Sequence, residues 1–293
     1  MAEKDITEKN LEALNDVFAD IVNVLLFKGE RVVHENELES DTTKSMFKAD
    51  GEIHEQERDV SKFWKNGEIR ISILGFENQT KQDSDMPLRV MSYDGASYKQ
   101  QLLDKKLKKN YPVATLVLYF GTKTKWKLPK SLYDCFEVPE KLKPFVSNYK
   151  INVFNIAWLS KKTIEMFQSD FKIVANYFRA ERLKTDYTGS KEVIRHVDET
   201  LKMLSALTGD DSFEKVYNET NEKRGGVTMC EVVERIRNKG IAIGRIEGAR
   251  NKAVENARNF LIETDLTPEK IALCCSLPVK EVLQLKKELV ERR

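Results

Sequence analysis

The 293-residue sequence has few of the residues that most often mark a metal or redox site. Its four cysteines contain no Cys-x-x-Cys pair, and the spacing of the adjacent Cys274 and Cys275 suits neither a zinc site nor a disulfide. The three histidines, His34, His54 and His196, show no ligand spacing. We therefore expect reduced thiols, a cytoplasmic setting, and structural or surface roles for the histidines.

Long hydrophobic runs are also missing. The opening stretch "MAEKDITEKNLEALND" lacks the apolar region of a signal peptide. The longest apolar run has about the length of "ATLVLYF", whereas a bilayer crossing needs ~20 residues. We expect no membrane partner.

Neither sign of charge dominates. Forty-nine Lys and Arg stand against forty-seven Asp and Glu, so the formal net charge is only +2 and gives no general attraction to a polyanion. Between Gln101 and Lys130, however, eight lysines accompany a single acid, Asp104. They are Lys105, Lys106, Lys108, Lys109, Lys123, Lys125, Lys127 and Lys130. This stretch is either a solvated helix end or a phosphate-facing patch.

The pattern of apolar residues in the first part of the chain is typical of an α/β fold. Apolar residues at helical spacing predict a helix over 6–27, and turn formers at 46–51 predict a loop or short hairpin. The Asn66-Gly67 step between two β-prone runs predicts a hairpin, and Pro87 fits the first turn of a helix over 85–109.

Two further strands complete this pattern. "YPVATLVLYFG" is apolar on both faces, which predicts a central strand, and "INVFNIAWL" precedes a helix over 161–182. We predict an α/β fold, a central mixed sheet flanked by helices, over residues 1–186, and an all-helical C-terminal region over 187–293.

Within the C-terminal region, Gly240, Gly244 and Gly248 recur every four residues. Each glycine costs a helix about 1 kcal/mol relative to alanine, so the spacing indicates either a packed or self-associating helix, and hence a homo-oligomer, or a flexible linker. Helix starts at Thr267-Pro268 and near Pro278 predict a helical hairpin or a helix-turn-helix that reads DNA.

Polar residues end the strand "EIRISILGFEN". Side chains alternate along a strand, so Ile73, Gly75, Glu77 and Gln79 share one face, which begins apolar and ends polar. A three-residue loop, Lys65 to Gly67 with Gly67 in the left-handed conformation, would pair Asp59 near Ile73 or Gly75 and place it on the face of Glu77. We predict this arrangement.

Two close carboxylates repel each other unless a cation joins them. Oxygen ligands with open positions favour Mg²⁺ or Mn²⁺ over zinc. Such an ion activates a bound water and polarises a phosphoryl oxygen, which is the chemistry of phosphodiester hydrolysis.

Several motifs surround these residues: "FADIVN" in the first helix, "ENQT", "MPLRVMSYDGASY", "VLYFG" followed by Trp126, "SLYD" and the GRxEG-like stretch from Gly244 to Gly248. With Asp59, Glu77 and Gln79 they resemble the D…ExK signature of the PD-(D/E)XK nuclease superfamily, and in particular its branch of recombination-promoting nucleases and transposase-like proteins. The resemblance covers most of the chain and implies a restriction-endonuclease-like core.

The resemblance implies a bacterial metal-dependent DNA endonuclease with Asp59, Glu77 and Gln79 as catalytic residues. The metal ligands would be Asp59 and Glu77, with Asp20 as the acid from the first helix. Gln79 stands where the wider superfamily has lysine; it can orient a water but carries no positive charge. A catalytically inert DNA-binding or assembly protein is therefore the alternative.

Cations near these residues are candidates for DNA contact. We predict DNA binding by Lys81, Arg89, Lys105, Lys106, Lys108 and Lys109. For Arg89 and Tyr93, four apart on one helix face, packing and ion pairing are equally good interpretations. Trp126, between two lysines, is either a stacking platform for a base or a hydrophobic anchor under a loop.

Overall fold

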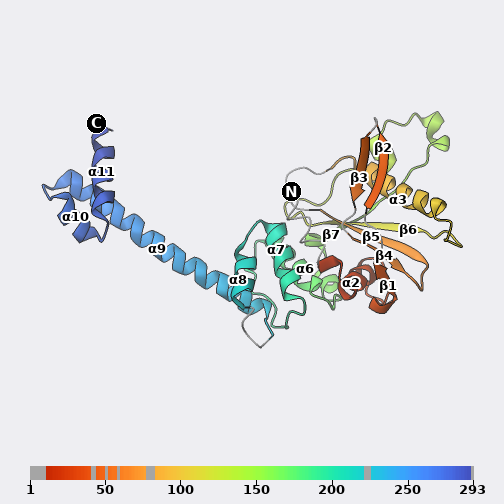
Figure 1. Ribbon diagram of the computed structural model, residues 1–293, viewed down its shortest axis with the longest axis horizontal. Helices are drawn as coiled ribbons and strands as arrows, with labels where there is room; N and C mark the ends of the chain where they lie inside the picture. The colour runs from red at the N-terminus through yellow and green to blue at the C-terminus, as the bar shows by residue number, and fades with distance from the viewer. Residues whose placement is uncertain are drawn as a thin grey trace. The chain divides into compact units, whose positions relative to one another are not determined.

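The computed structural model describes residues 11–40, 44–49, 52–57, 60–76, 83–220 and 226–291 (Figure 1). The chain separates into two compact units, Met1–Val233 and Glu234–Arg293. The sequence predicts a boundary after residue 186, so the first compact unit extends further along the chain than the α/β region predicted there. Within the described ranges, no helix combines the length and the hydropathy that crossing a membrane requires.

A five-stranded mixed sheet forms the centre of the first unit, in the order β1-β4-β5-β6-β7. The strands are β1 (Leu38–Ser40), β4 (Val60–Trp64), β5 (Ile69–Phe76), β6 (Val113–Tyr119) and β7 (Asn152–Asn155). β4 pairs antiparallel with both β1 and β5, whereas β5, β6 and β7 run parallel. The predicted α/β class and central mixed sheet are confirmed, and β6 is an interior strand, next to the edge strand β7.

A separate hairpin precedes β4. It consists of β2 (Lys44–Ala49) and β3 (Glu52–Glu57), which pair antiparallel. Residues 46–49, predicted as part of a loop or short hairpin, thus belong to strand β2 of this hairpin, and residues 50 and 51 lie outside the described ranges. The run "IHEQERDVSKFW" contributes to both sheets, because β3 and β4 belong to different ones.

Alternation along β6 sorts the core into two layers. Val117 and Tyr119 pack in one cluster with Met86, Val90 and other residues of α3 (Met86–Leu103). The intervening positions lead to Phe120, whose ring lies 5.2 Å from that of Phe178 in α6 (Phe171–Leu183). Figure 1 shows α3 and α2 (Asn15–Leu25) on opposite sides of the sheet.

Two predicted helices differ from the structure: one ends earlier than predicted, and the other is divided into two. α3 begins with Pro87 in its first turn, as expected, but ends at Leu103 rather than at 109. The Gln101 side chain bonds both the amide (2.8 Å) and the carbonyl (3.1 Å) of Tyr111, which fixes the returning chain. The helix predicted over 161–182 divides into α5 (Lys161–Ile164) and α6.

Short elements connect the layers. They are the 3₁₀ turns Glu35–Glu37, Glu140–Phe145 and Ile156–Trp158 and the helix α4 (Leu132–Cys135). After α6, α7 (Val197–Thr208) and α8 (Ser212–Thr220) pack against each other, and α7 contacts α6. Phe213 of α8 lies edge-on to Tyr177 of α6, with 5.6 Å between centroids. These contacts place α7 and α8 in the first unit.

The second unit consists of helices. α9 (Met229–Glu263) has 35 residues and is followed by α10 (Pro268–Cys275) and α11 (Val279–Glu291), close to the predicted starts. Ile271, Ala272, Val282 and Leu285 bury a small core with Ala257 of α9. The glycine-rich stretch is thus helical and not a flexible linker.

Candidate functional site

The carboxyl ends of the three parallel strands form one edge of the sheet, called here the carboxyl edge. Phe76 of β5 pairs with Tyr119 of β6, and Tyr119 pairs with Asn155 of β7. Glu77 follows Phe76 directly in sequence, and Asp59 directly precedes Val60, the first residue of the antiparallel strand β4. Asp59, Glu77, Gln79 and Lys81 themselves lie outside the described residues.

The hairpin between β4 and β5 differs from the prediction. Trp64 pairs with Ile69 and Val60 pairs with Ile73, so the connection comprises the four residues 65–68 and not three. A three-residue loop was the geometric reason for expecting Asp59 on the face of Glu77. With four residues that reason is lost, and the pairing of the two acids depends on the family resemblance.

The loop has a clear physical cause. Glu37 accepts hydrogen bonds from the Trp64 indole (2.8 Å) and from the Asn66 side chain, and its carbonyl accepts from the Lys65 amide (3.0 Å). Gly67 was expected in the left-handed conformation, but Glu68 adopts it, with a φ of 45°. Gly67 is needed for another reason, because a Cβ there would lie 2.2 Å from the Trp64 ring.

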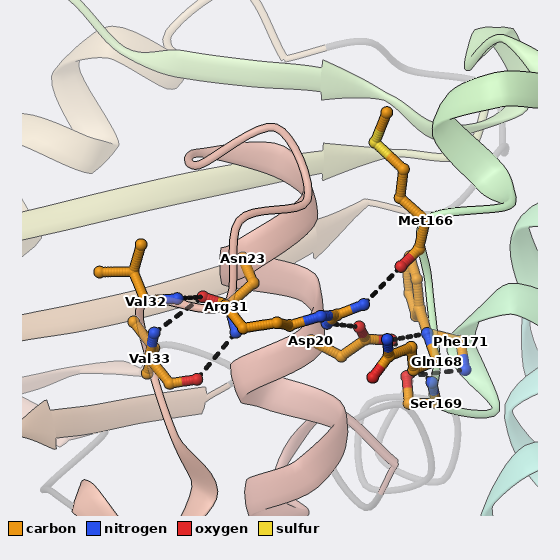
Figure 2. Close-up of polar contacts among 9 residues, drawn as sticks. All are labelled: Asp20, Asn23, Arg31, Val32, Val33, Met166, Gln168, Ser169 and Phe171. Atoms are coloured by element: carbon orange, nitrogen blue, oxygen red, sulfur yellow. Dashed lines mark hydrogen bonds and ion pairs between the residues drawn. The ribbon is translucent and has the colours of Figure 1, made fainter.

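Asp20 lies within the described residues, and both oxygens of its carboxylate accept hydrogen bonds (Figure 2). One oxygen pairs with the Arg31 guanidinium, and the other accepts the amides of Gln168 (2.8 Å) and Ser169 (2.7 Å). The Asp20 side chain is 4% exposed, against 31% for Arg31. Arg31 also donates to the Met166 carbonyl, so the pair fastens α2 to the turn before α6.

Asn23, one turn further along α2, has a similar fastening role. Its amide oxygen accepts from the amides of Val32 (3.0 Å) and Val33 (2.8 Å), and its nitrogen donates to the Val33 carbonyl (2.8 Å). A cavity of about 580 Å³ opens beside both residues. It is lined among others by Asp16, Asp20, Asn23, Arg31, His34 and Arg195.

A metal site therefore does not form among the described residues alone. They contain no group of three or more His, Cys, Asp or Glu side chains placed to hold an ion. Asp20 does not fit a ligand role in this arrangement, because Arg31 and two amides already occupy its oxygens. By donor type, Asp59 and Glu77 suit a hard cation such as Mg²⁺.

β6 separates the eight lysines into groups. Lys105, Lys106, Lys108 and Lys109 precede β6, in the segment that leads from α3 to the amino end of that strand. This amino edge lies about 25 Å from the carboxyl edge, since β5 has eight residues of ~3.3 Å each. Lys109 pairs with Glu68 at 2.7 Å, and the hydrogen bond lowers the pKa of the Glu68 carboxyl.

Lys123 and Lys125 follow β6 at the carboxyl edge. This position is fixed by neighbouring bonds: the Gly121 carbonyl accepts from the Trp158 indole (3.0 Å), and the Trp126 amide donates to Asn155 (2.7 Å). Lys130 is different, because its carbonyl accepts from the Ile151 amide just before β7 begins.

The ring of Trp158 contacts two cationic side chains at the carboxyl edge. The Lys125 ammonium lies 5.5 Å and the Arg182 guanidinium 4.6 Å from the centroid of its ring. Arg182 also donates to the Ala157 carbonyl at 2.8 Å. Sequence reasoning missed this cluster, because it placed Trp158 inside the predicted strand "INVFNIAWL", whereas β7 ends at Asn155 and leaves Trp158 at the edge of the sheet.

The other candidates have structural partners. Arg89 pairs with Asp83 at 2.8 Å and donates to the hydroxyl of Tyr93, so it has an ion pair, while Tyr93 is buried against β6 and has a packing role. Trp126 is buried as a hydrophobic anchor. His196 pairs with Asp16 at 2.8 Å, and all four cysteines are free thiols.

The chain was compared with protein families, curated proteins and solved structures. Residues 64–207 match the sequence model of the family described as "Putative transposase, YhgA-like". The matched segment contains β5, β6, β7 and the helices from α3 to α7. No curated protein and no solved structure is detectably similar to the chain.

Proposed function

We propose that this chain, whose residues 64–207 belong to the YhgA-like transposase family of the PD-(D/E)XK branch, is a metal-dependent DNA endonuclease linked to recombination or to a mobile element. The observation that carries the proposal is the carboxyl edge of the sheet. There β5, β6 and β7 end together, and the sequence continues from β5 directly into Glu77 and Gln79.

Asp59 and Glu77 would hold Mg²⁺ or Mn²⁺, because carboxylate oxygens are the ligands that these ions prefer. The bound ion would supply an activated water and charge stabilisation for phosphodiester hydrolysis. Gln79 would orient the water through its amide. Asp20 remains the proposed third ligand from α2, on condition that the ion displaces Arg31 from its carboxylate.

DNA would cross the carboxyl edge. Lys123, Lys125 and Arg182 lie there, and Lys81 and Arg89 are close to it in sequence. Contacts from these cations would position the backbone near the acids. Lys105, Lys106, Lys108 and Lys109, at the amino edge, would contact the duplex some distance from the cleaved bond.

The test is nicking of supercoiled plasmid DNA in Mg²⁺ or Mn²⁺ by the wild type and by Glu77→Ala. We expect nicking by the wild type only. Glu137→Ala is the matched control, because Glu137 is an exposed glutamate on the segment after α4. Manganese binding measured by calorimetry should be lost in Glu77→Ala and kept in Glu137→Ala. Equal nicking by all three proteins would remove the proposal.

A second function is favoured by one residue. Gln79 lacks the positive charge of the superfamily lysine, which suits a protein that binds DNA or assembles on it without cleaving it. Absence of manganese binding by the wild type, together with salt-dependent DNA affinity, would support this second function over the first.

A further inference from the structure

A second cavity, of about 490 Å³, lies in the first unit beside α6. One wall is the face of α6 that carries Asn176, Arg179 and Ala180, at helical spacing. The facing wall is the segment 185–190, which follows α6 after Lys184 turns the chain with a φ of 53°. Lys161, the first residue of α5, completes the rim.

The Arg179 side chain has no hydrogen bond or ion pair with a described residue, and its Nε atom is buried without a partner. Burying this N–H group without an acceptor is unfavourable, because its desolvation is not offset. Lys161 at the rim likewise forms no ion pair with a described residue. Two cations thus line one cavity, and neither forms an ion pair with an acidic side chain of the described residues.

Neutral donors surround these cations. Asn176 contributes an amide, and Thr188 and Ser190 contribute hydroxyls to the lining. Burial raises the pKa of the Tyr187 hydroxyl, with Tyr177 adding to the shift, so this phenol keeps its proton and can donate it in a hydrogen bond. Asp186 is the one carboxylate among the residues that line the cavity. The lining is therefore rich in donors and carries net positive charge.

The wall opposite α6 is held firmly. The Cys230 amide at the start of α9 donates to the Ser190 carbonyl at 2.9 Å. Gly189 has a φ of 75°, and a Cβ there would lie 2.5 Å from the Met229 backbone. Only glycine allows this close approach. The donors of segment 185–190 are thus preorganised, which lowers the entropic cost of binding a small ligand.

We propose that this cavity binds a phosphate group, carried either by the 5′ end of a nucleic acid strand or by a free nucleotide. A planar guanidinium, an ammonium and several hydroxyls match the tetrahedral oxygens of a phosphate, and arginine can bond two of them at once. The unpaired Arg179 provides the central contact, and Lys161 provides the second charge at the open rim.

The site is independent of the metal centre proposed above. None of its lining residues is among the candidate ligands Asp59, Glu77 and Asp20, and binding can be measured without divalent metal. A protein that fails to cleave DNA can still bind phosphate here, and the reverse holds as well.

The test compares fluorescent single-stranded oligonucleotides that differ only in a 5′-phosphate or a 5′-hydroxyl, with EDTA present. Inorganic phosphate and adenosine monophosphate are titrated separately by calorimetry. We expect the wild type to bind inorganic phosphate. If a strand end is the source, the 5′-phosphate strengthens oligonucleotide binding about tenfold or more. If a free nucleotide is the source, adenosine monophosphate binds and the 5′-phosphate gives no gain.

Arg179→Met and Lys161→Glu should each weaken phosphate binding at least about tenfold. Lys162→Glu is the matched control, since Lys162 is an exposed lysine one position further on that does not line the cavity. Lys161 is also exposed, so its variant tests the site even if Arg179→Met does not fold. Absence of phosphate binding by the wild type, or equal binding by Lys161→Glu and Lys162→Glu, would overturn the proposal.

Discussion

The buried carboxylate of Asp20 in α2 and the partly exposed guanidinium of Arg31 form an ion pair that holds two distant parts of the first unit together. Asp20 also accepts the amides of Gln168 and Ser169, 148 and 149 residues further along the chain. The position that family resemblance assigns to a metal ligand therefore has a complete structural role of its own. Stability and activity measurements can separate the two.

Asp20→Asn should destabilise the first unit by about 3 kcal/mol, because removing one partner leaves the Arg31 charge poorly compensated in a mostly buried setting. The free energy of unfolding from urea denaturation measures this loss. Asp211→Asn is the control, since Asp211 pairs with Lys215 four residues further on at an exposed position. That substitution should change stability by less than about 0.5 kcal/mol.

If Asp20→Asn instead leaves stability intact and abolishes manganese binding, the carboxylate serves the metal and the ion pair with Arg31 is secondary. Measuring both quantities on one protein sample makes the two roles distinguishable.

Gln79→Ala should lower the rate of plasmid nicking at saturating DNA about tenfold to a hundredfold, since one hydrogen-bonding group that positions the water is lost. Gln79→Lys should retain nicking, because an ammonium restores the charge that the wider superfamily has at this position. Initial rates under metal saturation measure the effect. Unchanged rates in Gln79→Ala would exclude Gln79 from the reaction.

The two edges of the sheet predict different effects for two pairs of lysines. Lys123→Ala with Lys125→Ala should reduce both the salt dependence of DNA binding and the nicking rate at saturating DNA, the latter about tenfold, because these residues lie at the carboxyl edge. Lys105→Ala with Lys106→Ala should reduce the salt dependence alone. Each lost phosphate contact lowers the slope of log K against log salt by about 0.9. The opposite pattern would place the cleaved bond at the amino edge.

Local patterns in the sequence predicted most elements of the sheet, because strand alternation and apolar runs are set by neighbours in the chain. The "YPVATLVLYFG" run and the Pro87 helix start are examples. Features set by distant residues were not predictable. The hairpin loop takes its length from Glu37, which bonds Trp64 and Asn66, and no local signal in the loop encodes that contact.

The same distinction applies to the candidate site. The lysines of 101–130 form one basic stretch in the sequence, yet a strand passes through it and carries its two ends to opposite edges. The Trp158 cluster joins Lys125, Trp158 and Arg182, which are far apart in sequence, and the Arg179 cavity depends on how the chain folds back after α6. A pattern confined to one segment cannot show such groupings.

Lys62 gives a pH-dependent prediction. Its side chain is buried in β4, with the ammonium donating to the Ser40 hydroxyl at 3.2 Å, and burial lowers its pKa below the ordinary 10.5. The folded state thus binds this proton less tightly than the unfolded state, so the stability contribution rises with pH between the lowered pKa and 10.5.

Lys62→Met should therefore be more stable than the wild type at pH 7, by about 1 kcal/mol, and this advantage should shrink as the pH approaches 10.5. Urea denaturation at pH 7, 9 and 10 measures the difference. Lys65→Met, at an exposed position paired with Glu39, should show no comparable trend. A constant difference across this range would mean that Lys62 titrates normally.

The glycines of α9 give the last prediction. A Cβ added at Gly240, Gly244 or Gly248 would meet no atom of the described residues within 4 Å, so that part of the chain offers no packing reason for them. Replacing all three by alanine should stabilise the helix by about 1 kcal/mol per position, because alanine loses less backbone entropy than glycine. Thermal unfolding and sedimentation equilibrium on the full chain provide the measurement. Alanine variants that unfold at lower temperature and dissociate into smaller species would show instead that the glycines pack against a second copy, as a self-associating helix requires.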